Sequence, residues 1–561
     1  MKKLINKSIY IILSILLFCI PIINSHLLDF FGIKLGIYVN GNYEFTKVMF
    51  FNIISGIILI LFGIKTFFNK KKVIIPKYTL FFIIMILFST IFSLSLYTSL
   101  FGNSEKGHSL IMFTNLLGVF IILLNTQKKI LNNLLKILII SALITCIIGI
   151  WQLYFPSFDY KELSDRLIGT FGHPNYISLF FLLIIPLLYP INERYNIKKY
   201  IKIVFLFILL IGLILTKSFI AIFLTFSYLF FVLFKNKKYK LYIFTIFIFL
   251  GIILIIKIFP EKLSSLISRF FIWETTLKII FSNIKIFFIG GGTETLSYLF
   301  DNYKSEYLYI FEQIGFTADR PHNIILNFFY HFGILGLIFI LTIYITITKK
   351  FINKKTPINI SLFLGSIFLL LNFASIASYL LIILLFSLSN SKVIKVKANY
   401  LGLIFIIIPI LGIYYSYKFY ISEIYAYKNN YETAIKYFPY NPYNYYKIGD
   451  YKSGLEKEKL KSEKYYLTKI YSLKNPEKDC KKLIKNYYSV ENYLFCGNFL
   501  WEIGKYKDAK SYYKNGTKKL PDLWNDNSKY YNNIIIKKFI SGNRFFSEKY
   551  SNIKQILKRI N

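Results

Sequence analysis

Long apolar stretches alternate with short polar links from the N-terminus to about residue 416, and this alternation is the strongest pattern in the chain. A stretch long enough to cross ~30 Å of hydrocarbon predicts a membrane-spanning helix. Thirteen stretches qualify: about 8–24, 48–68, 78–96, 110–125, 134–154, 176–190, 201–216, 218–234, 241–258, 324–347, 358–374, 376–390 and 400–416. They are apolar nearly all round, so their periodicity does not indicate which faces meet lipid. The pattern predicts an all-α, polytopic membrane bundle over residues 1–416.

The links between these stretches differ in charge, and the difference predicts their orientation. Six lysine-rich links fall on one side: 69–77, 126–129, 192–202, 235–240, 348–355 and 391–397. Basic links stay on the cytoplasmic side of a membrane, which places the N-terminus inside. An odd number of spans then places the tail, 417–561, outside. We therefore expect a multi-pass membrane protein with an extracytoplasmic C-terminal domain.

Composition agrees with this interpretation. The chain has 561 residues, of which 55% are hydrophobic, and Lys plus Arg exceed Asp plus Glu by 68 to 28, a net charge of +40. Much of that excess lies in the links, so we assign it to membrane orientation and not to nucleic-acid binding. Met1, Lys2 and Lys3 precede a short apolar run that resembles a signal peptide, but no small-residue cleavage site follows, which favours an uncleaved first helix.

Four cysteines give no disulfide framework or metal site by their spacing. Cys19 and Cys146 fall in apolar stretches, and Cys480 and Cys496 fall in the tail. We interpret Cys496 as a thiol in the core of the tail, with a disulfide to Cys480 as the alternative. No Asp-x-Asp pair occurs in the outer links, so we expect neither a metal nor a cofactor.

The tail is polar and Tyr-rich, and one stretch of it resembles a tetratricopeptide unit. In Tyr493–Pro521 the matching residues are Gly497, Gly504, Tyr506, Ala509, Tyr513 and Pro521, at the spacing of two packed antiparallel helices. Residues 429–438 resemble a partial second copy, and 445–475 is predicted to be helical with a different spacing. Since one unit cannot bury its own face, we expect a small array of irregular helical hairpins. By analogy with other arrays of this kind, we expect the tail to bind another protein, either as a substrate or as an assembly partner.

Rare residue types indicate where chemistry takes place. Four of the five histidines lie in outer links (His26, His108, His173 and His322), and His331 lies in the helix that follows His322. Three of the six arginines, Arg166, Arg269 and Arg320, also lie in outer links, although nearly all basic residues are Lys. Arginine offers a planar fork of donors that grips phosphate in two places, whereas ordinary anchoring to lipid headgroups is the alternative.

The order of motifs around these residues resembles the bacterial O-antigen ligase and O-antigen polymerase family. Residues 320–323, Arg-Pro-His-Asn, begin the pattern His-Asn-x9-Gly-x-x-Gly that ends at Gly336. Upstream, 166–188 resembles the family's Arg, Gly-Thr-Phe and Pro-Asn stretch, and 268–300 resembles its Arg, Trp and Gly-x-Gly run. Within residues 215–224, Phe219 occupies a position where the family commonly has Arg. The nearby Lys217 supplies a positive charge there. At His331 the family often has Glu. The resemblance covers about 97–390.

This resemblance implies a metal-independent transferase of the polytopic class, similar to GT-C glycosyltransferases, that moves a glycan from a polyprenyl-diphosphate donor to an acceptor hydroxyl. It implies His322 as the general base and Arg320 as a stabiliser of the diphosphate leaving group. Expected substrate-binding residues are Arg166, Arg269, His173, Asn175, Lys217, Asn323 and Trp273. The reaction is expected beneath the outer loop, 259–323.

Several residues keep a simpler interpretation beside the functional one. His322 at the start of a helix is also suited to a local hydrogen bond alone, and His331 to a buried position in the bundle. Gly290–Gly292 fits a flexible turn as well as a phosphate contact, and Trp273 fits interface anchoring as well as stacking on a sugar.

The acceptor is left open as a lipid, a glycan or a protein. A ligase, a polysaccharide polymerase and a protein O-oligosaccharyltransferase are therefore all consistent with the motifs. From another class, a lipid-linked-sugar flippase or transporter is the alternative, although such proteins need ionisable groups inside their spans, where this chain has almost none besides His331.

Overall fold

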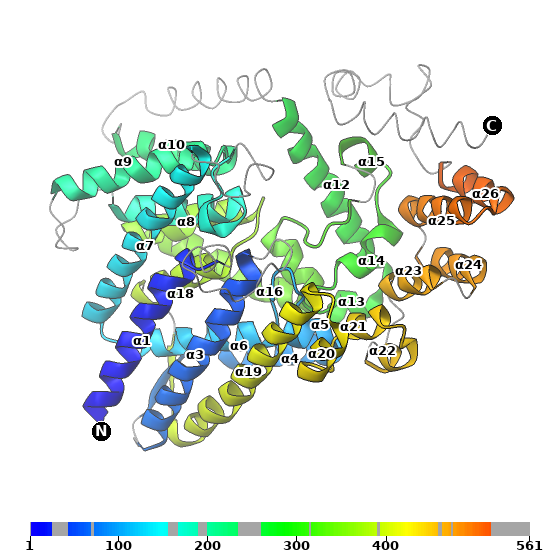
Figure 1. The fold of residues 1–561 in the computed structure, drawn as a ribbon. Coiled ribbons are helices and arrows are strands. Elements are labelled where there is room, and N and C mark those ends of the chain that lie inside the picture. The colour runs from blue at the N-terminus through cyan, green and yellow to red at the C-terminus, as the bar shows by residue number, and fades with distance from the viewer. Residues whose placement is uncertain are drawn as a thin grey trace.

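The fold is built almost entirely of helices. The computed structural model describes residues 2–24, 43–68, 72–154, 166–188, 199–233, 260–312, 316–389, 393–457, 463–472, 475–487 and 489–517. Within these residues the strands form a single two-stranded sheet, and all other regular structure is helical. The predicted all-α class is confirmed (Figure 1).

Twelve predicted spans lie in the described part of the chain, and each coincides with a helix. They are α1 (Lys2–Ile22), α3 (Tyr43–Phe67), α4 (Thr79–Ile91), α6 (Leu110–Leu124), α7 (Lys128–Tyr154), α8 (Pro174–Leu188), α9 (Lys199–Leu215), α10 (Phe219–Leu233), α16 (Ile324–Asn353), α17 (Pro357–Leu369), α18 (Ile376–Leu388) and α19 (Ala398–Tyr427). The predicted span 241–258 lies outside the described residues. Among the described helices, α1, α3, α7, α16 and α19 are the five long and apolar enough to cross a membrane, and the other seven are shorter. These helices are compatible with a multi-pass membrane protein.

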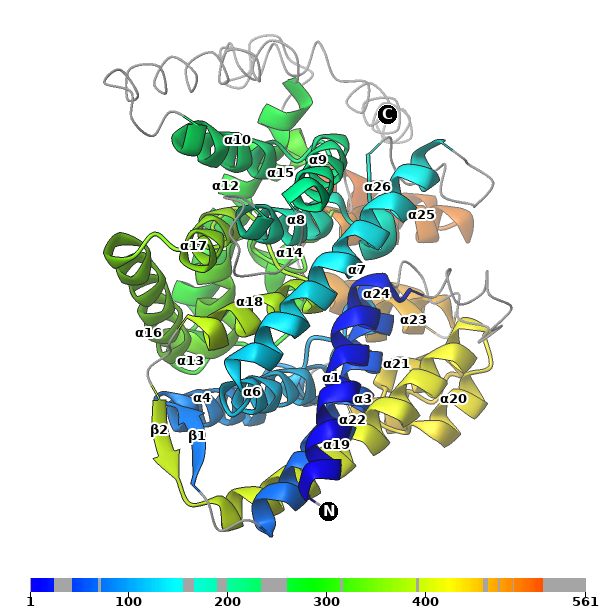
Figure 2. The ribbon, with the colours of Figure 1, turned by 90° about the vertical axis from the view of Figure 1, so that its left-hand side faces the viewer.

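The small sheet joins two links that are distant in the sequence. Strand β1 (Val73–Pro76) pairs antiparallel with β2 (Val393–Val396). At the end of α6, the Asn125 side chain accepts from the Ile74 N–H at 3.0 Å and donates to the Ile74 carbonyl at 2.7 Å. Two basic links, 69–77 and 391–397, therefore meet beside the start of a third, 126–129, at one end of the bundle (Figure 2).

A buried lysine ties α3 to the end of α1. Lys47 is fully buried, and its ammonium donates to the carbonyls of Ile20, Pro21 and Ile23 at 2.8, 2.9 and 2.6 Å. A cation is favourable there because the last carbonyls of a helix have no partner within it and carry partial negative charge. The sequence placed Lys47 in an outer link, whereas the structure places it in the second turn of α3, which begins at Tyr43.

The outer loop is largely helical and packs against a break in α16. It contains α12 (Pro260–Ser282), α13 (Ile284–Phe288), α14 (Ser297–Tyr303) and α15 (Leu308–Phe311). Helix α16 loses helical geometry at Gly333, where φ is 62° and ψ is −155°. A β-carbon there would lie 2.3 Å from the Phe288 carbonyl oxygen, so only glycine lets α13 approach so closely. The close approach at Gly333 is thus made by another helix of the same chain.

The described part of the tail is a row of short helices beside the outer loop (Figure 1). They are α20 (Tyr431–Tyr437), α21 (Pro442–Lys447), α22 (Tyr451–Lys457), α23 (Glu463–Tyr471), α24 (Pro476–Asn486), α25 (Val490–Glu502) and α26 (Tyr506–Thr517). Helices α25 and α26 form a hairpin that turns at Gly504 and packs Gly497 against the Tyr513 ring. Ala509 and Tyr513 are fully buried between them. Pro521 lies outside the described residues.

Our interpretation of Cys496 as a core thiol is wrong. A disulfide joins Cys480 on α24 to Cys496 on α25, with the two α-carbons 5.8 Å apart. Both residues are fully buried, as the sequence indicated for Cys496, but the packing of the two helices places their sulfur atoms face to face.

The tail contacts the outer loop directly. The Lys304 ammonium donates to Glu491 Oε1 at 2.5 Å, and the Tyr309 hydroxyl donates to Glu491 Oε2 at 3.1 Å. The Tyr309 ring is buried in the same apolar cluster as Val490 and Tyr513. The tail contains none of the motifs that resemble the O-antigen ligase family. It nevertheless contacts the outer loop, which contains the predicted site residues Arg269 and Arg320.

Candidate functional site

Phe373 lies in the turn between α17 and α18, at the centre of a group that contains three of the nine predicted site residues. The rings of His322, Tyr176 and His173 lie 4.8, 4.9 and 5.4 Å from its ring centroid. The Arg320 guanidinium carbon lies 5.6 Å from that centroid and the Lys106 ammonium 6.0 Å. Three predicted residues, Arg320, His322 and His173, are therefore brought together around one aromatic side chain.

Arg320 is buried and held by protein groups on several sides. Its Nη2 donates to Glu294 Oε1 at 3.1 Å, and its Nη1 donates to the Tyr176 hydroxyl at 3.2 Å. Its Nε lies 3.7 Å from the carboxylate of Asp319, which is itself paired with Lys106. Arg320 thus joins the outer loop to the first turn of α8, and its fork of donors already faces a carboxylate.

A chain of buried polar groups continues from Glu294. His108 lies between two carboxylates, with Nδ1 3.8 Å from Glu294 Oε1 and Nε2 3.4 Å from Glu44 Oε1. Glu44 Oε1 also accepts from the Ile376 backbone N–H at 2.6 Å, at the start of α18. Burial, followed by the charges of Arg320 and Lys106, holds the pKa of His108 well below its ordinary value. The network connects α3, the link before α6, the outer loop and α18.

His322 has an unusual backbone and a nitrogen without a partner. Its φ of 52° is in the left-handed region, which is uncommon for a residue with a β-carbon. Its Nδ1 is buried and has no hydrogen-bond partner among the described residues. Burial, followed by the charge of Arg269, holds the pKa of His322 well below its ordinary value, so the imidazole is neutral near pH 7. A neutral ring with a free nitrogen is the form that accepts a proton from an acceptor hydroxyl.

Of the other predicted residues, Arg269 contacts the central turn, Asn323 caps α16, and Trp273 packs on Phe270. Arg269 Nη1 donates to the Leu371 carbonyl at 2.6 Å, two residues before Phe373, and so connects α12 to the central turn. Asn323 Oδ1 caps α16 by accepting from the backbone N–H groups of Ile325 and Leu326. Trp273 lies one turn beyond Arg269, with its ring 5.0 Å from that of Phe270.

Arg166, Lys217 and Asn175 meet at the adjoining turn between α9 and α10. Arg166 Nε donates to the Thr216 carbonyl at 2.9 Å, and its Nη2 donates to the Lys217 carbonyl at 3.4 Å. Asn175 Oδ1 accepts from the Ser218 hydroxyl at 3.1 Å. Lys217 is exposed and has a positive φ of 48°. The charge at this turn thus comes from Arg166 and Lys217 together.

Three helices begin within this group, and side chains of the group accept from the backbone N–H groups of their first turns. In α8, the Asn175 N–H donates to His173 Nδ1 at 3.1 Å. Helix α16 begins after His322 and Asn323, and α18 begins three residues after Phe373. Helix N-termini carry partial positive charge and favour anions. Arg320, Arg269 and Lys106 add positive charge to this group, and the carboxylates of Glu294, Asp319 and Glu44 offset part of it.

His331 and the glycine run lie at the broken part of α16. His331 is buried, and neither ring nitrogen has a hydrogen-bond partner in the described residues. The Gly291 N–H donates to the Tyr330 carbonyl at 2.8 Å, and the Gly292 N–H donates to the His331 carbonyl at 3.2 Å. A β-carbon on Gly290 would lie 2.1 Å from that same carbonyl oxygen. The glycine run therefore serves tight backbone packing in this structure.

Sequence reasoning missed Glu44, Glu294, Lys106 and Phe373. The two glutamates carried a usable signal, since the chain has only 28 acidic residues and Glu44 lies four residues before the apolar run that begins at Val48. Lysine and phenylalanine are too common here to be distinctive, with 58 phenylalanines in the chain. Among the described residues, no group of three or more His, Cys, Asp or Glu side chains is arranged to hold a metal ion.

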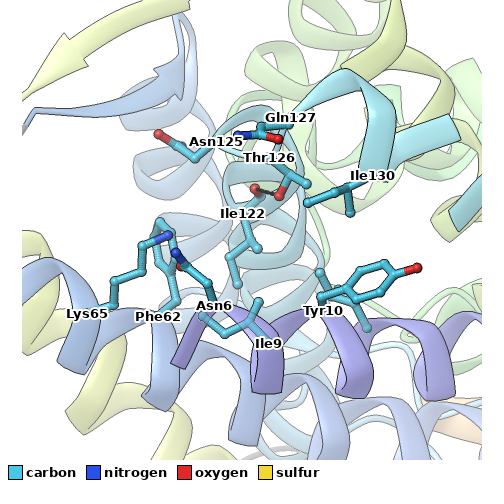
Figure 3. Close-up of a pocket in the computed structure, with 11 residues that line it drawn as sticks. Asn6, Ile9, Tyr10, Phe62, Lys65, Ile122, Asn125, Thr126, Gln127 and Ile130 are labelled. Atoms are coloured by element: carbon cyan, nitrogen blue, oxygen red, sulfur yellow. Dashed lines mark hydrogen bonds between the residues drawn. The ribbon is translucent and has the colours of Figure 1, made fainter. Parts of the chain in front are cut away.

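A separate cavity of about 200 Å³ lies at the C-terminal ends of α3 and α6, away from the candidate site (Figure 3). Phe62 and Lys65 line it from the last turns of α3, whereas Glu44 is in the first turn. Asn6 and Tyr10 of α1 and Gln127 complete its polar lining. The cavity belongs to the end of the bundle where the links 69–77, 126–129 and 391–397 meet.

Comparisons with protein families, with curated proteins and with solved structures find no match to this chain.

Proposed function

We propose that this protein is a membrane glycosyltransferase that moves a glycan from a polyprenyl-diphosphate donor to an acceptor hydroxyl, in the manner of O-antigen ligases. The observation that carries the proposal is the meeting of Arg320, His322 and His173 around Phe373, next to three helix N-termini. Cations and helix N-termini favour the diphosphate, and a neutral imidazole with a free nitrogen serves the acceptor. The motif resemblance of residues 97–390 gives this arrangement its specific chemistry.

In the proposed reaction, His322 takes the proton of the acceptor hydroxyl while that oxygen attacks the anomeric carbon of the donor. The bond from that carbon to the diphosphate breaks, and the lipid diphosphate leaves with the bonding electron pair. Arg320, Arg269 and the helix N-termini stabilise the charge that develops on the leaving group. Arg166 and Lys217 bind donor phosphate from the adjoining turn, and His173, Asn175, Asn323 and Trp273 complete the substrate site. No metal is needed for this scheme.

The proposed location is the outer face of the bacterial inner membrane. With thirteen predicted spans, the candidate site and the tail would lie outside, and the basic links, some of which meet at the β1–β2 sheet, would lie inside. The Cys480–Cys496 disulfide is consistent with an oxidising environment for the tail. The hairpin of α25 and α26 supports the proposed tetratricopeptide-like character of the tail, which would contact a protein acceptor or an assembly partner.

The function is tested with purified full-length protein and a polyprenyl-diphosphate-linked oligosaccharide in detergent. We expect release of the lipid diphosphate and a new glycan linkage without added metal, unchanged by a chelator. Offering a lipid, a glycan and a protein hydroxyl as separate acceptors distinguishes a ligase from a polymerase and from a protein O-oligosaccharyltransferase. Movement of the intact lipid-linked glycan across a vesicle membrane without glycan transfer would instead indicate the flippase alternative.

A further inference from the structure

Asn372 is a buried side chain whose hydrogen-bonding groups are all unused. It lies in the turn between α17 and α18, directly before Phe373, and is 1% exposed. Neither its Oδ1 nor its Nδ2 has a hydrogen-bond partner among the described residues. Native proteins pair nearly all buried polar groups, because a buried amide without partners destabilises the fold. The presence of a buried amide without hydrogen-bond partners therefore calls for a functional explanation.

Two other unpartnered polar atoms lie around the same turn. Glu44 contacts the turn through its Oε1, which accepts from the Ile376 N–H, while its Oε2 is buried and has no hydrogen-bond partner in the described residues. His322 packs its ring on Phe373 and has a buried, unpartnered Nδ1. Three segments that are far apart in the sequence therefore contact or form this turn, and each contains a buried polar atom without a hydrogen-bond partner among the described residues.

The turn itself is held firmly, so the position of Asn372 is fixed. Arg269 donates to the Leu371 carbonyl on one side, and Glu44 accepts from the Ile376 N–H on the other. The Ser375 hydroxyl caps α18 by accepting from the Ser378 N–H at 3.3 Å. A side chain presented on a rigid turn loses little freedom when it binds a ligand.

The chemistry of an amide identifies the class of ligand. Asparagine offers two donors and an acceptor. A diphosphate accepts hydrogen bonds but donates none when ionised, and a lipid chain does neither. Sugar hydroxyls donate and accept, so they satisfy both ends of the amide. A diphosphate beside the cations around Phe373 would place its first sugar next to Asn372.

We infer that Asn372 binds the hydroxyl groups of the sugar adjacent to the diphosphate. This inference rests on the proposed function, because it takes the ligand to be a lipid-linked glycan. Asn372 is therefore a specificity-determining residue for the carbohydrate part of the donor, separate from the cations that attract its diphosphate.

The first test is the stability of Asn372→Leu in the full-length protein. Leucine has nearly the shape of asparagine and has no unpaired groups, so the melting temperature in detergent is expected to stay unchanged or rise. Asn359→Leu on α17 is the matched control, because the Asn359 amide donates to the Lys350 and Lys354 carbonyls at 3.1 and 2.7 Å. Asn359→Leu is expected to lower the melting temperature. A similar drop for Asn372→Leu would show that its amide has a structural role, and would overturn the inference.

The second test compares the binding of two probes, undecaprenyl diphosphate and undecaprenyl-diphosphate-linked N-acetylglucosamine. Asn372→Leu is expected to bind the sugar-linked probe about tenfold more weakly, the size of one or two lost hydrogen bonds, and the bare diphosphate within about twofold of wild type. If Asn372→Leu binds each probe as tightly as wild type does, the amide contacts only water. That result would overturn the inference. Wild-type protein that binds neither probe would instead contradict the proposed function.

Discussion

Arg320 and Glu294 form a buried ion pair, with Nη2 of the arginine 3.1 Å from Oε1 of the glutamate. Glu294 follows the glycine run that packs against the broken part of α16, and its backbone has a φ of 60°. Burial is the main influence on the Glu294 carboxyl and raises its pKa, while the charge of Arg320 opposes that shift. The pair fixes Arg320, which lies two positions before the proposed base, His322. It thereby connects the packing of the outer loop to the candidate site.

Glu294→Gln is expected to loosen Arg320 and to lower both stability and turnover. Removing the charge of one buried partner should cost roughly 1–3 kcal/mol of unfolding free energy, because the arginine stays buried with a weaker acceptor. Glu274→Gln is the control, since Glu274 and Lys278 form an exposed pair on α12 that should contribute at most a few tenths of a kcal/mol. Thermal unfolding and donor turnover measure both effects. Equal effects for the two variants would show that the buried pair has no special role.

The pH dependence of the reaction should differ between the free and the donor-bound protein. His322 acts in its neutral form, and in the free protein burial and Arg269 keep its pKa well below 6.5. The value of kcat/KM should therefore not fall as the pH is lowered from 8 to about 6. A bound diphosphate is an anion and raises this pKa, so kcat should begin to fall at a higher pH than kcat/KM. Identical profiles for the two constants would contradict this role of His322.

The contact between the tail and the outer loop should control the order of α14 and α15. Glu491→Gln weakens the bonds to Lys304 and Tyr309, so hydrogen exchange across 297–311 should become faster. Glu502→Gln, an exposed residue on the same helix, is the matched control and should leave the exchange unchanged. Unchanged protection in Glu491→Gln would show that this contact does not hold the loop. This measurement requires no substrate, so its result does not depend on the proposed activity.

The topology is tested by reporters fused within the chain. A reporter after Asn561 should be found outside the cytoplasm and one at Lys354 inside. These positions follow from the six basic links and the odd number of predicted spans. A cytoplasmic tail would mean that the span count is wrong by one, with the short hairpin of α17 and α18 as the first place to look.

The sequence predicted the helices well because apolar length is a local property. Each predicted span in the described residues is a helix, although α4 ends at Ile91, five residues before the predicted end at 96. Just beyond it, the Leu94 N–H donates to the Gly291 carbonyl at 2.9 Å, a contact with the outer loop. No local pattern could have indicated that contact, and the same holds for the docking of Tyr309 on the tail.

The site was predictable only where the residue types are rare. Arg320, His322 and His173 were selected because arginine and histidine are scarce in this chain, and the structure brings them together around Phe373. Phe373 and Lys106 belong to abundant types, and their positions depend on tertiary contacts alone. The pairing of Cys480 with Cys496 likewise depends on how α24 and α25 pack, which the spacing of the two cysteines does not determine.

The most direct test of the proposed function is single-turnover transfer by purified His322→Ala with a polyprenyl-diphosphate-linked glycan. We expect donor binding within about twofold of wild type and a rate reduced by ~10²–10⁴, the usual contribution of a general base. His331→Ala is the matched control and should be affected less, and Arg320→Lys should weaken donor binding or turnover because lysine lacks the planar fork. Near-normal turnover by His322→Ala would contradict the account.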